Sequence, residues 1–298
     1  MYKSLGLTGN IAKKDLPELV KKIGGWCARN HIQAFVEHSL FPLLKLGRQT
    51  HFKITQGDFK ECDFLCALGG DGFFLHAVRN LYPIQIPILP INLGSLGFTA
   101  QALPKEITSV LNLIQKNKIQ ITERYLLNVE NDGSSFINAP KVALNDVLII
   151  KDTRSRLIHV EVSVNGQSIG EVPCDGLVIS SATGSTAYNL SAGGPIVHPT
   201  LRSMIITPLL PHTISARPVV LPSNMSIEIK QVCRKDREDA LFCVDGQYWW
   251  NAQAGKCVRV SLAEKPIRIF EPYPARYFEK FRRNLRWGLS PRATDGAL

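Results

Sequence analysis

Hydrophobic positions in the first third of the chain follow two alternating spacings, one typical of strands and one typical of helices. Four short apolar runs, at residues 2–7, 32–36, 64–68 and 86–92, predict strands. Between them, apolar residues recur at i, i+3, i+4 and i+7, which predicts helices after Asp15, after Gly72 and from about Pro104. The positions expected to face inward are Leu16, Leu19, Val20, Ile23, Trp26, Cys27, Phe74, Ala77, Val78, Leu81, Ile107, Val110, Leu111 and Ile114. This alternation predicts an α/β domain over residues 1–118 with a mainly parallel sheet.

From about residue 118 the spacing becomes almost entirely that of strands. The segments concerned are 119–129, 136–150, 157–164, 168–172, 177–181, 218–221, 225–229, 241–244, 257–262 and 267–270. Asn165-Gly166 separates two of these segments and is a strong signal for a two-residue hairpin. We therefore expect a β-rich, sandwich-like second domain over residues 119–273. A final amphipathic helix over residues 274–290 is expected to pack back on the first domain.

Composition and charge narrow the class of protein. The chain has 298 residues and a formal net charge of +10, which favours anionic partners such as nucleotides. Much of the excess lies between Arg276 and Arg286, where aromatic side chains interleave with the basic ones. A docked helix explains that pattern, so no nucleic-acid partner is expected.

The sequence also carries no sign of membrane insertion, secretion or a cysteine framework. No apolar stretch reaches the ~20 residues that span a bilayer, and the N-terminus lacks a signal-peptide pattern. The seven cysteines are scattered without the spacing of a zinc site or a disulfide framework. We expect a cytoplasmic protein with no membrane partner.

The most informative motif is Gly69-Gly70-Asp71-Gly72, between a predicted strand and a predicted helix. Glycines let a phosphate approach the backbone, and a helix N-terminus offers free N–H donors to it. The carboxylate of Asp71 would repel a phosphate, so a hydroxyl group or a metal ion is expected there as well. The alternative is an ordinary turn in which Asp71 caps the helix, and the motif alone does not decide between the two.

Two further segments place polar groups beside predicted strands. The run Asn-Leu-Gly-Ser-Leu-Gly-Phe at 92–98 follows a strand directly, where ligands bind in open parallel sheets. Asn145 and Asp146 interrupt an apolar strand, which costs stability unless they are hydrogen-bonded or bind a ribose or a hydrated metal. The structural alternatives are a Gly-rich turn at 92–98 and a bulge or a turn at Asn145 and Asp146.

Residues 175–195 form the longest unusual stretch, dense in hydroxyl-bearing and small residues. Its glycines permit close backbone approach, and Tyr188 offers a ring for stacking on a heterocycle. A tightly packed loop at a domain junction is the alternative. Other nucleotide and hydrolase motifs are missing from the sequence: there is no P-loop, no HExxH and no GxSxG, and Leu75 occupies the position of the third glycine of GxGxxG.

Taken together, these segments resemble the NAD kinase family, whose members use ATP or polyphosphate. The resemblance rests on GGDG at 69–72, the run at 92–98, the Asn–acid pair at 145–146 and the block at 175–195. It continues through Ser-Ala-Arg-Pro at 215–218, Asp-Gly-Gln at 245–247 and Leu-Arg-Trp-Gly at 285–288. The resemblance implies transfer of the γ-phosphate of ATP to the 2′-hydroxyl of the adenosine ribose of NAD, which yields NADP. It also implies Mg²⁺ or another divalent cation, held mainly by the phosphates rather than by protein ligands, and a homodimer or homotetramer.

The resemblance further implies roles for individual residues. Asp71 would orient the acceptor hydroxyl and take its proton. The residues expected to bind the phosphates of ATP are Gly69, Gly70, Gly72 and His76. The residues expected to bind NAD are Asn92, Phe98, Asn145, Asp146, Asp175, Thr183, Thr186, Ala187, Tyr188 and Ser191.

Two residues depart from the family pattern. Phe73 replaces the usual threonine, and Asp146 replaces the usual glutamate, which retracts the carboxylate by about 1.5 Å. These departures motivate an alternative hypothesis, a catalytically weak or inactive NAD(P)-binding sensor. A lipid kinase, which shares the GGDG loop, is a further alternative that the block at 175–195 disfavours. The sequence leaves open the phosphate donor, the preference for NAD or NADH, the oligomer size and allosteric control.

Overall fold

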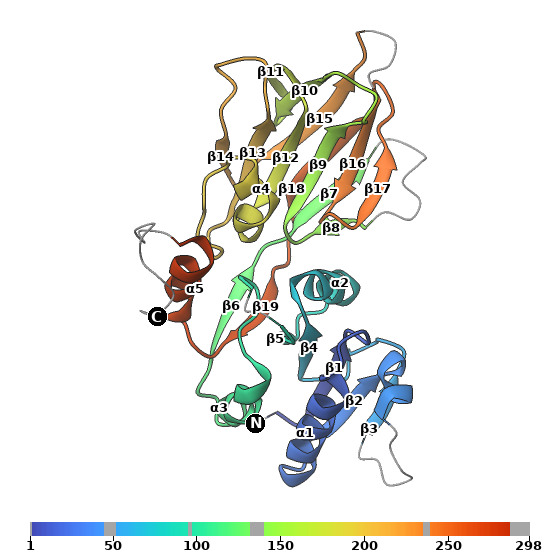
Figure 1. Ribbon diagram of the computed structural model, residues 1–298, viewed down its shortest axis with the longest axis vertical. Helices are drawn as coiled ribbons and strands as arrows, with labels where there is room; N and C mark the ends of the chain where they lie inside the picture. The colour runs from blue at the N-terminus through green and yellow to red at the C-terminus, as the bar shows by residue number, and fades with distance from the viewer. Residues whose placement is uncertain (1, 45–51, 95–96, 132–139, 235–238, 287–298) are drawn as a thin grey trace. The chain divides into compact units, whose positions relative to one another are not determined.

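The computed structural model describes residues 2–44, 52–94, 97–131, 140–234 and 239–286. The chain divides into two compact units, and Figure 1 labels the helices and strands of each. The first unit comprises Met1–Thr122 and Ile267–Leu298, and the second comprises Glu123–Pro266.

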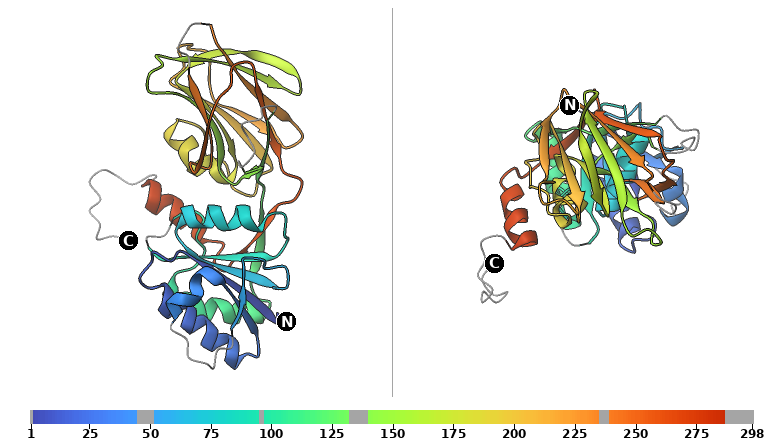
Figure 2. Two further views of the ribbon diagram at one scale, coloured as in Figure 1. Left: turned by 90° about the vertical axis from the view of Figure 1, so that its right-hand side faces the viewer. Right: turned by 90° about the horizontal axis from the view of Figure 1, so that it is seen from above.

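The first unit is built on a seven-stranded sheet. Its strands, in spatial order, are β3 (Phe52–Thr55), β2 (Gln33–Glu37), β1 (Ser4–Gly9), β4 (Phe64–Gly69), β5 (Pro87–Asn92), β19 (Ile267–Glu271) and β6 (Gln120–Arg124). Every neighbouring pair from β3 to β19 is parallel. Helices α1 (Leu16–Arg29) and α3 (Ile107–Gln115) cover one face, and α2 (Asp71–Leu81) covers the other (Figure 2). The predicted α/β domain with a mainly parallel sheet is confirmed.

Helices on both faces explain which residues are buried in this unit. Strands β4 and β5 are buried along their whole length, as expected of parallel strands covered on both sides. All the helix positions expected to face inward are buried. Strand β3 was not predicted, because it is a four-residue edge strand whose two apolar residues are the partly buried Phe52 and the exposed Ile54.

The order of the strands reverses next to β1. The chain runs from β1 to β2 and β3 on one side, and then places β4 and β5 on the other side. In open α/β sheets, ligands bind beyond the carboxyl ends of the strands at such a reversal. Here those ends are Gly9, where β1 finishes, and the loop from Gly69 to Asp71 after β4.

The final helix, α5 (Arg276–Leu285), packs on the first unit as expected. Arg276 makes two hydrogen bonds to Glu106, of 2.7 and 3.1 Å, and Lys280 donates to the carbonyl of Ala100. The described helix is shorter than the predicted span of 274–290, and residues 287–290 lie outside the described residues. Strands β6 and β19 were assigned to the second domain by sequence but complete the first sheet, so the units divide after Thr122 and Pro266.

The second unit consists of two six-stranded antiparallel sheets. One runs β11 (Gln167–Cys174), β10 (Ile158–Val164), β15 (Ser226–Val232), β18 (Cys257–Leu262), β7 (Leu127–Asn131) and β8 (Val142–Ala143). The other runs β14 (Val219–Pro222), β13 (Ser203–Leu209), β12 (Gly176–Ser181), β9 (Asp146–Lys151), β16 (Ala240–Val244) and β17 (Tyr248–Asn251). A single buried apolar cluster draws residues from both sheets, among them Val160, Ile179 and Phe242. The predicted sandwich is therefore confirmed.

The hairpin between β10 and β11 turns at Asn165-Gly166, as predicted. Both residues have positive φ, 51° and 76°, which is the geometry of a two-residue turn between twisted strands. Strands β13 and β17 were not predicted. Strand β13 is buried at every position and carries Pro208, so it lacks the alternation that marks a half-exposed strand. No helix among the described residues is long and apolar enough to span a bilayer.

Candidate functional site

The GGDG loop connects β4 directly to α2. Gly70 is the N-cap residue, in an extended conformation, and Asp71 is the first helical residue. The alternative in which Asp71 caps the helix is therefore wrong. The half-buried Asp71 carboxylate stands at the positive end of the α2 dipole, beside the backbone N–H groups of the first turn. The loop thus offers anion-binding donors and a carboxylate in the same place.

The loop after β5 lies against the GGDG loop. Gly69 pairs with Asn92 in the sheet, and the N–H of Leu93 donates to the carbonyl of Gly69 at 3.1 Å. Asn92 is buried, while Phe98 is half-buried. The two loops that the sequence placed at neighbouring strand ends therefore form one edge of the first unit.

Two residues of this second loop contact Asp71 itself. The hydroxyl of Thr99 donates to Oδ1 of Asp71. The backbone at Gly97 lies so close that any side-chain carbon there would overlap the Asp71 carboxylate. A glycine is required at position 97 for this close approach. Sequence reasoning missed both contacts, because the partners are separated by more than twenty residues and no local spacing connects them.

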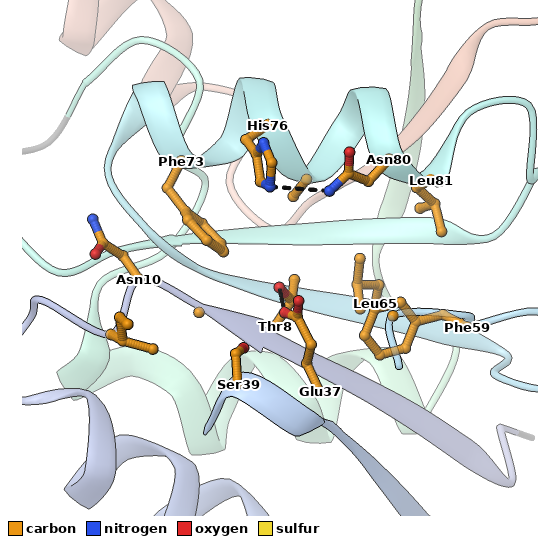
Figure 3. Close-up of a pocket in the computed structure, with 14 residues that line it drawn as sticks. Thr8, Asn10, Glu37, Ser39, Phe59, Leu65, Phe73, His76, Asn80 and Leu81 are labelled. Carbon is orange, nitrogen blue, oxygen red and sulfur yellow. Dashed lines mark hydrogen bonds between the residues drawn. The ribbon is translucent and has the colours of Figure 1, made fainter. Parts of the chain in front are cut away.

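A cavity of about 360 Å³ opens beside the carboxyl ends of β1 and β2, under α2 (Figure 3). Its polar lining includes Thr8, Asn10 and Glu37 from the sheet side and His76 and Asn80 from α2. The hydroxyl of Thr8 donates to Oε2 of Glu37, and Nε2 of His76 lies 3.0 Å from Nδ2 of Asn80. This is the position at which the strand order reverses, so the cavity has both the place and the polarity of a ligand site. Of its lining residues, the sequence had singled out only His76 as a binding residue.

Phe73 also lines this cavity (Figure 3). Its ring covers Gly69, where an added Cβ would lie 2.7 Å from Cβ of Phe73. The residue that departs from the family pattern therefore forms an apolar wall of the cavity, two residues after Asp71.

In the second unit, Asn145 and Asp146 lie at the start of β9, beside Asp245. The Asp245 carboxylate accepts the backbone N–H groups of Leu144, Asn145 and Asp146 at 3.1, 2.7 and 3.3 Å. Asp146 is buried, and burial together with the negative charge of Asp245 raises its pKa to about 7. Asn145 lies in the bend between β8 and β9, and Asp146 is the first residue of β9, so the chain turns at the polar pair and its backbone is held there by a third, distant carboxylate.

The small-residue block after β12 packs onto Asn145. Oγ of Ser181 donates to the carbonyl of Leu144 at 2.5 Å and accepts the N–H of Gly184 at 3.0 Å. Gly184 lies against the Asn145 backbone so closely that a Cβ would overlap it. Asn145, Asp146 and the start of this block therefore form one cluster.

The rest of the block presents side chains for binding. Thr183 Oγ1 is buried and has no hydrogen-bond partner among the described residues. Tyr188 is 44% exposed, so its ring is available for stacking. Thr186 and Ala187 are half-buried and Ser191 is exposed. The buried side chain of Asn189 accepts a hydrogen bond from the Thr207 hydroxyl at 2.6 Å. It also donates to the carbonyls of Ser185 and Pro195, both at 3.1 Å. These three hydrogen bonds fix the conformation of the block.

Asp175 does not join this cluster. It precedes β12, whereas Ser181 ends that strand, so the two lie about 20 Å apart along an extended chain. Its carboxylate instead pairs with Lys151 at 2.9 Å, and both side chains are about one-quarter exposed.

The predicted residues fall into two groups, one in each unit. Those in the first unit are Gly69, Gly70, Asp71, Gly72, His76, Asn92 and Phe98. Those in the second are Asn145, Asp146, Asp175, Thr183, Thr186, Ala187, Tyr188 and Ser191. Within the second unit, Asp245 joins the cluster through its hydrogen bonds to the backbone of Asn145 and Asp146. The Asp-Gly-Gln run at 245–247 was the one signal for this residue in the sequence.

Comparisons with known proteins agree with this arrangement. Residues 9–119 match the ATP-NAD kinase N-terminal domain, and residues 144–271 match the ATP-NAD kinase C-terminal domain. An NAD kinase of Pseudomonas fluorescens is 33% identical over 290 residues, which cover 96% of each chain. An NAD kinase of Geobacter sulfurreducens is 38% identical over 254 residues, which cover 84% of this chain and 89% of the relative.

Solved structures share the fold. Yeast NADH kinase, in complex with NADH, superposes with a TM-score of 0.88 at 22% identity, covering 98% of this chain and 89% of that one. An NAD kinase from Archaeoglobus fulgidus, in complex with ATP, gives a TM-score of 0.73 at 22% identity, covering 95% and 98%. With both domain families matched in order over most of its length, the chain belongs to the NAD kinase family, enzymes that transfer a phosphoryl group to NAD.

Proposed function

We propose that Asp71 is the catalytic base of this NAD kinase. The observation that carries the proposal is the position of its carboxylate, at the N-terminus of α2 and beside the glycine loop. In the reaction, the 2′-hydroxyl oxygen of the adenosine ribose forms a bond to the γ-phosphorus while the bond from phosphorus to the bridging oxygen breaks and ADP leaves. The hydroxyl proton passes to Asp71. Gly70 and Gly72 leave room for the phosphates near the N–H groups of the first helical turn.

The cavity under α2 is the proposed site of the donor nucleotide. It lies at the reversal of the strand order, next to the loop that would hold the phosphates. Thr8 and Glu37 offer groups for ribose hydroxyls, and Phe73 offers an apolar wall. The family member from Archaeoglobus fulgidus was solved with ATP, and we propose ATP as the donor here, with polyphosphate as the alternative to be tested.

The proposed metal is Mg²⁺ or another divalent cation that arrives with the nucleotide. Among the described residues no three His, Cys, Asp or Glu side chains gather into a metal cage. Mg²⁺ commonly keeps several waters and binds through substrate phosphates, so the phosphates of the donor would hold the ion mainly, and Asp71 would remain available as the base. When bound, the ion would neutralise charge on the β- and γ-phosphates.

The cluster in the second unit is the proposed site of NAD. Asn145 and Asp146 would hold ribose hydroxyls, and Tyr188 would stack on a ring, with Thr183, Thr186, Ala187 and Ser191 around them. Asp175 lies at the far end of β12 from this cluster. The resemblance to the family supports a homodimer or homotetramer, in which Asp175 would face NAD bound to a neighbouring subunit. Nothing favours the sensor alternative: Asp71 is present, and the relatives named above are kinases.

The test is NADP formation from NAD and Mg²⁺ with either ATP or polyphosphate as donor. The parent protein should form NADP, and Asp71→Asn should lose at least about 100-fold in kcat, the usual scale for a positioned base. Asp15→Asn is the matched control and should retain activity. Asp15 is the N-cap residue of α1, but its side chain makes no capping hydrogen bond, so the change from aspartate to asparagine should have little effect there. A parent that binds NAD but forms no NADP with either donor would refute the proposal.

A further inference from the structure

The two oxygens of the Asp71 carboxylate have different neighbours. Thr99 donates its hydroxyl proton to Oδ1. Oδ2 faces Gly97, where an added Cβ would overlap it, and within the described part of the chain it accepts no hydrogen bond. A threonine is stiff at χ1 because it is branched at Cβ. Its hydroxyl is therefore a well-oriented donor, which selects one rotation of the carboxylate and leaves the second oxygen for the incoming hydroxyl.

The segment that carries Thr99 is held firmly to the sheet. The N–H of Gln101 donates to the carbonyl of Pro90 at 3.0 Å, and the N–H of Asn92 donates to the carbonyl of Ala102 at 3.1 Å. Nε2 of Gln101 donates to the carbonyl of Thr99 at 3.3 Å. The first two of these hydrogen bonds fix the segment after Thr99 relative to β5, and the third closes the segment on the Thr99 carbonyl.

Helix α5 fixes the same segment from outside. The buried ammonium of Lys280 donates to the carbonyl of Ala100, the residue after Thr99, and to Oε1 of Gln101 at 3.4 Å. Hydrogen bonds from ionised donors are the stronger ones. Farther along the segment, the Arg276 guanidinium pairs with Glu106 at 2.7 Å. The last helix therefore restrains the backbone that presents Thr99 to Asp71.

This arrangement also gives a physical account of the departure at position 73. A hydroxyl next to the GGDG loop is lost when phenylalanine replaces threonine, and Asp71 is flanked by two flexible glycines. Thr99 supplies a hydroxyl to the same loop from another segment. Phe73 meanwhile packs over Gly69 and lines the cavity.

We propose that Thr99 is a positioning residue for Asp71: its hydroxyl orients the carboxylate so that Oδ2 accepts the proton of the acceptor hydroxyl, and α5 fixes the segment through Lys280. The inference rests on the proposed function of Asp71 and adds a residue to it. Thr99 touches no substrate in this account, so its loss should slow the chemical step without weakening binding.

The test compares Thr99→Val, which removes the hydroxyl at nearly constant shape, with Thr99→Ser, which keeps it. Thr99→Val should lower kcat about 10- to 100-fold, the range expected when a charge-assisted hydrogen bond is lost in the transition state. The KM values for NAD and ATP should stay within about 2-fold, because uniform binding is untouched. Thr99→Ser should restore most of the parent kcat. Thr122→Val is the matched control: the Thr122 hydroxyl is buried in the same unit with no hydrogen-bond partner among the described residues, and the variant should keep parent kcat.

The outcomes separate this inference from the proposed function. Thermal melting checks the fold, and Thr99→Ala takes the place of Thr99→Val if the valine variant is unfolded. An active parent whose Thr99→Val and Thr99→Ala variants keep full kcat overturns the inference alone. Equal losses in the serine and valine variants, or a loss confined to KM, also overturn it. A parent that forms no NADP overturns the proposed function and the inference with it.

Discussion

The buried carboxyl of Asp146 makes the stability of the protein depend on pH in an unusual direction. Burial, together with the charge of Asp245, raises its pKa from 3.8 to about 7. In the unfolded chain the same group loses its proton near pH 4. Between about pH 4 and pH 7 the folded protein therefore binds more protons than the unfolded chain, and the free energy of unfolding falls as the pH rises through this window.

The size of the effect follows from the two pKa values. The pKa of Asp146 rises from 3.8 to about 7, a difference of about three pH units. Each unit corresponds to about 1.4 kcal/mol, so the free energy of unfolding changes by at most about 4 kcal/mol. Asp146→Asn replaces the carboxyl with a neutral amide of almost the same shape and removes this dependence. The stability of the variant relative to the parent should rise by about 2 kcal/mol between pH 5 and pH 7 and level off above about pH 8.

Urea unfolding of the ligand-free parent and variant at pH 5, 6, 7 and 8 measures this difference, because all other titrations cancel on subtraction. Asp58→Asn is the matched control. The backbone N–H and the ammonium of Lys60 hold the pKa of Asp58 below its usual value, so Asp58 stays ionised throughout that pH range and its variant should differ from the parent by a constant. A difference between Asp146→Asn and the parent that does not change from pH 5 to pH 8 would refute a buried, proton-binding Asp146.

Two further predictions concern the packing of each unit. Lys280→Met should lower the free energy of unfolding by about 1–3 kcal/mol, because the carbonyl of Ala100 and the amide oxygen of Gln101 lose their buried donor. Lys105→Met is the control, because Lys105 is exposed, and it should change the free energy of unfolding by less than about 0.5 kcal/mol. If urea unfolding shows equal effects for the two variants, Lys280 does not anchor this segment. Gly184→Ala should abolish NAD binding in calorimetric titrations, because the added carbon would displace the Asn145 backbone. Gly25→Ala is the control for Gly184→Ala, because a Cβ at Gly25 would meet only the Arg29 guanidinium, at 3.6 Å. Undiminished NAD binding by Gly184→Ala would show that the cluster tolerates a shift of Asn145.

Residues close together in the chain were largely predictable. The inward faces of α1, α2 and α3, the hairpin at Asn165-Gly166 and the glycine loop at Asp71 all follow from local spacing and turn chemistry. The motifs in sequence order were enough to indicate the family. The edge strand β3 was missed because its alternating run is only four residues long, and the fully buried β13 was missed because it lacks the alternation of a half-buried strand.

Contacts between residues far apart in the chain could not be predicted in this way. Strands β6 and β19 were assigned to the wrong unit, since only their backbone partners decide which sheet they join. The three N–H groups held by Asp245 lie about 100 residues from it, and no periodicity reports such a pair. The same holds for Lys280 and Ala100.

The sequence by itself determined most of the local elements and the residues for which we propose chemical roles, because spacing, turn residues and motif order are local properties. Only the tertiary structure decided what surrounds those residues. It brought the Thr99 hydroxyl to Asp71, raised the pKa of Asp146 by burying it beside Asp245, and separated Asp175 from the rest of its motif by the length of β12. Hydrogen bonding and burial depend on distance in space, and the chain reaches those distances only after it has folded.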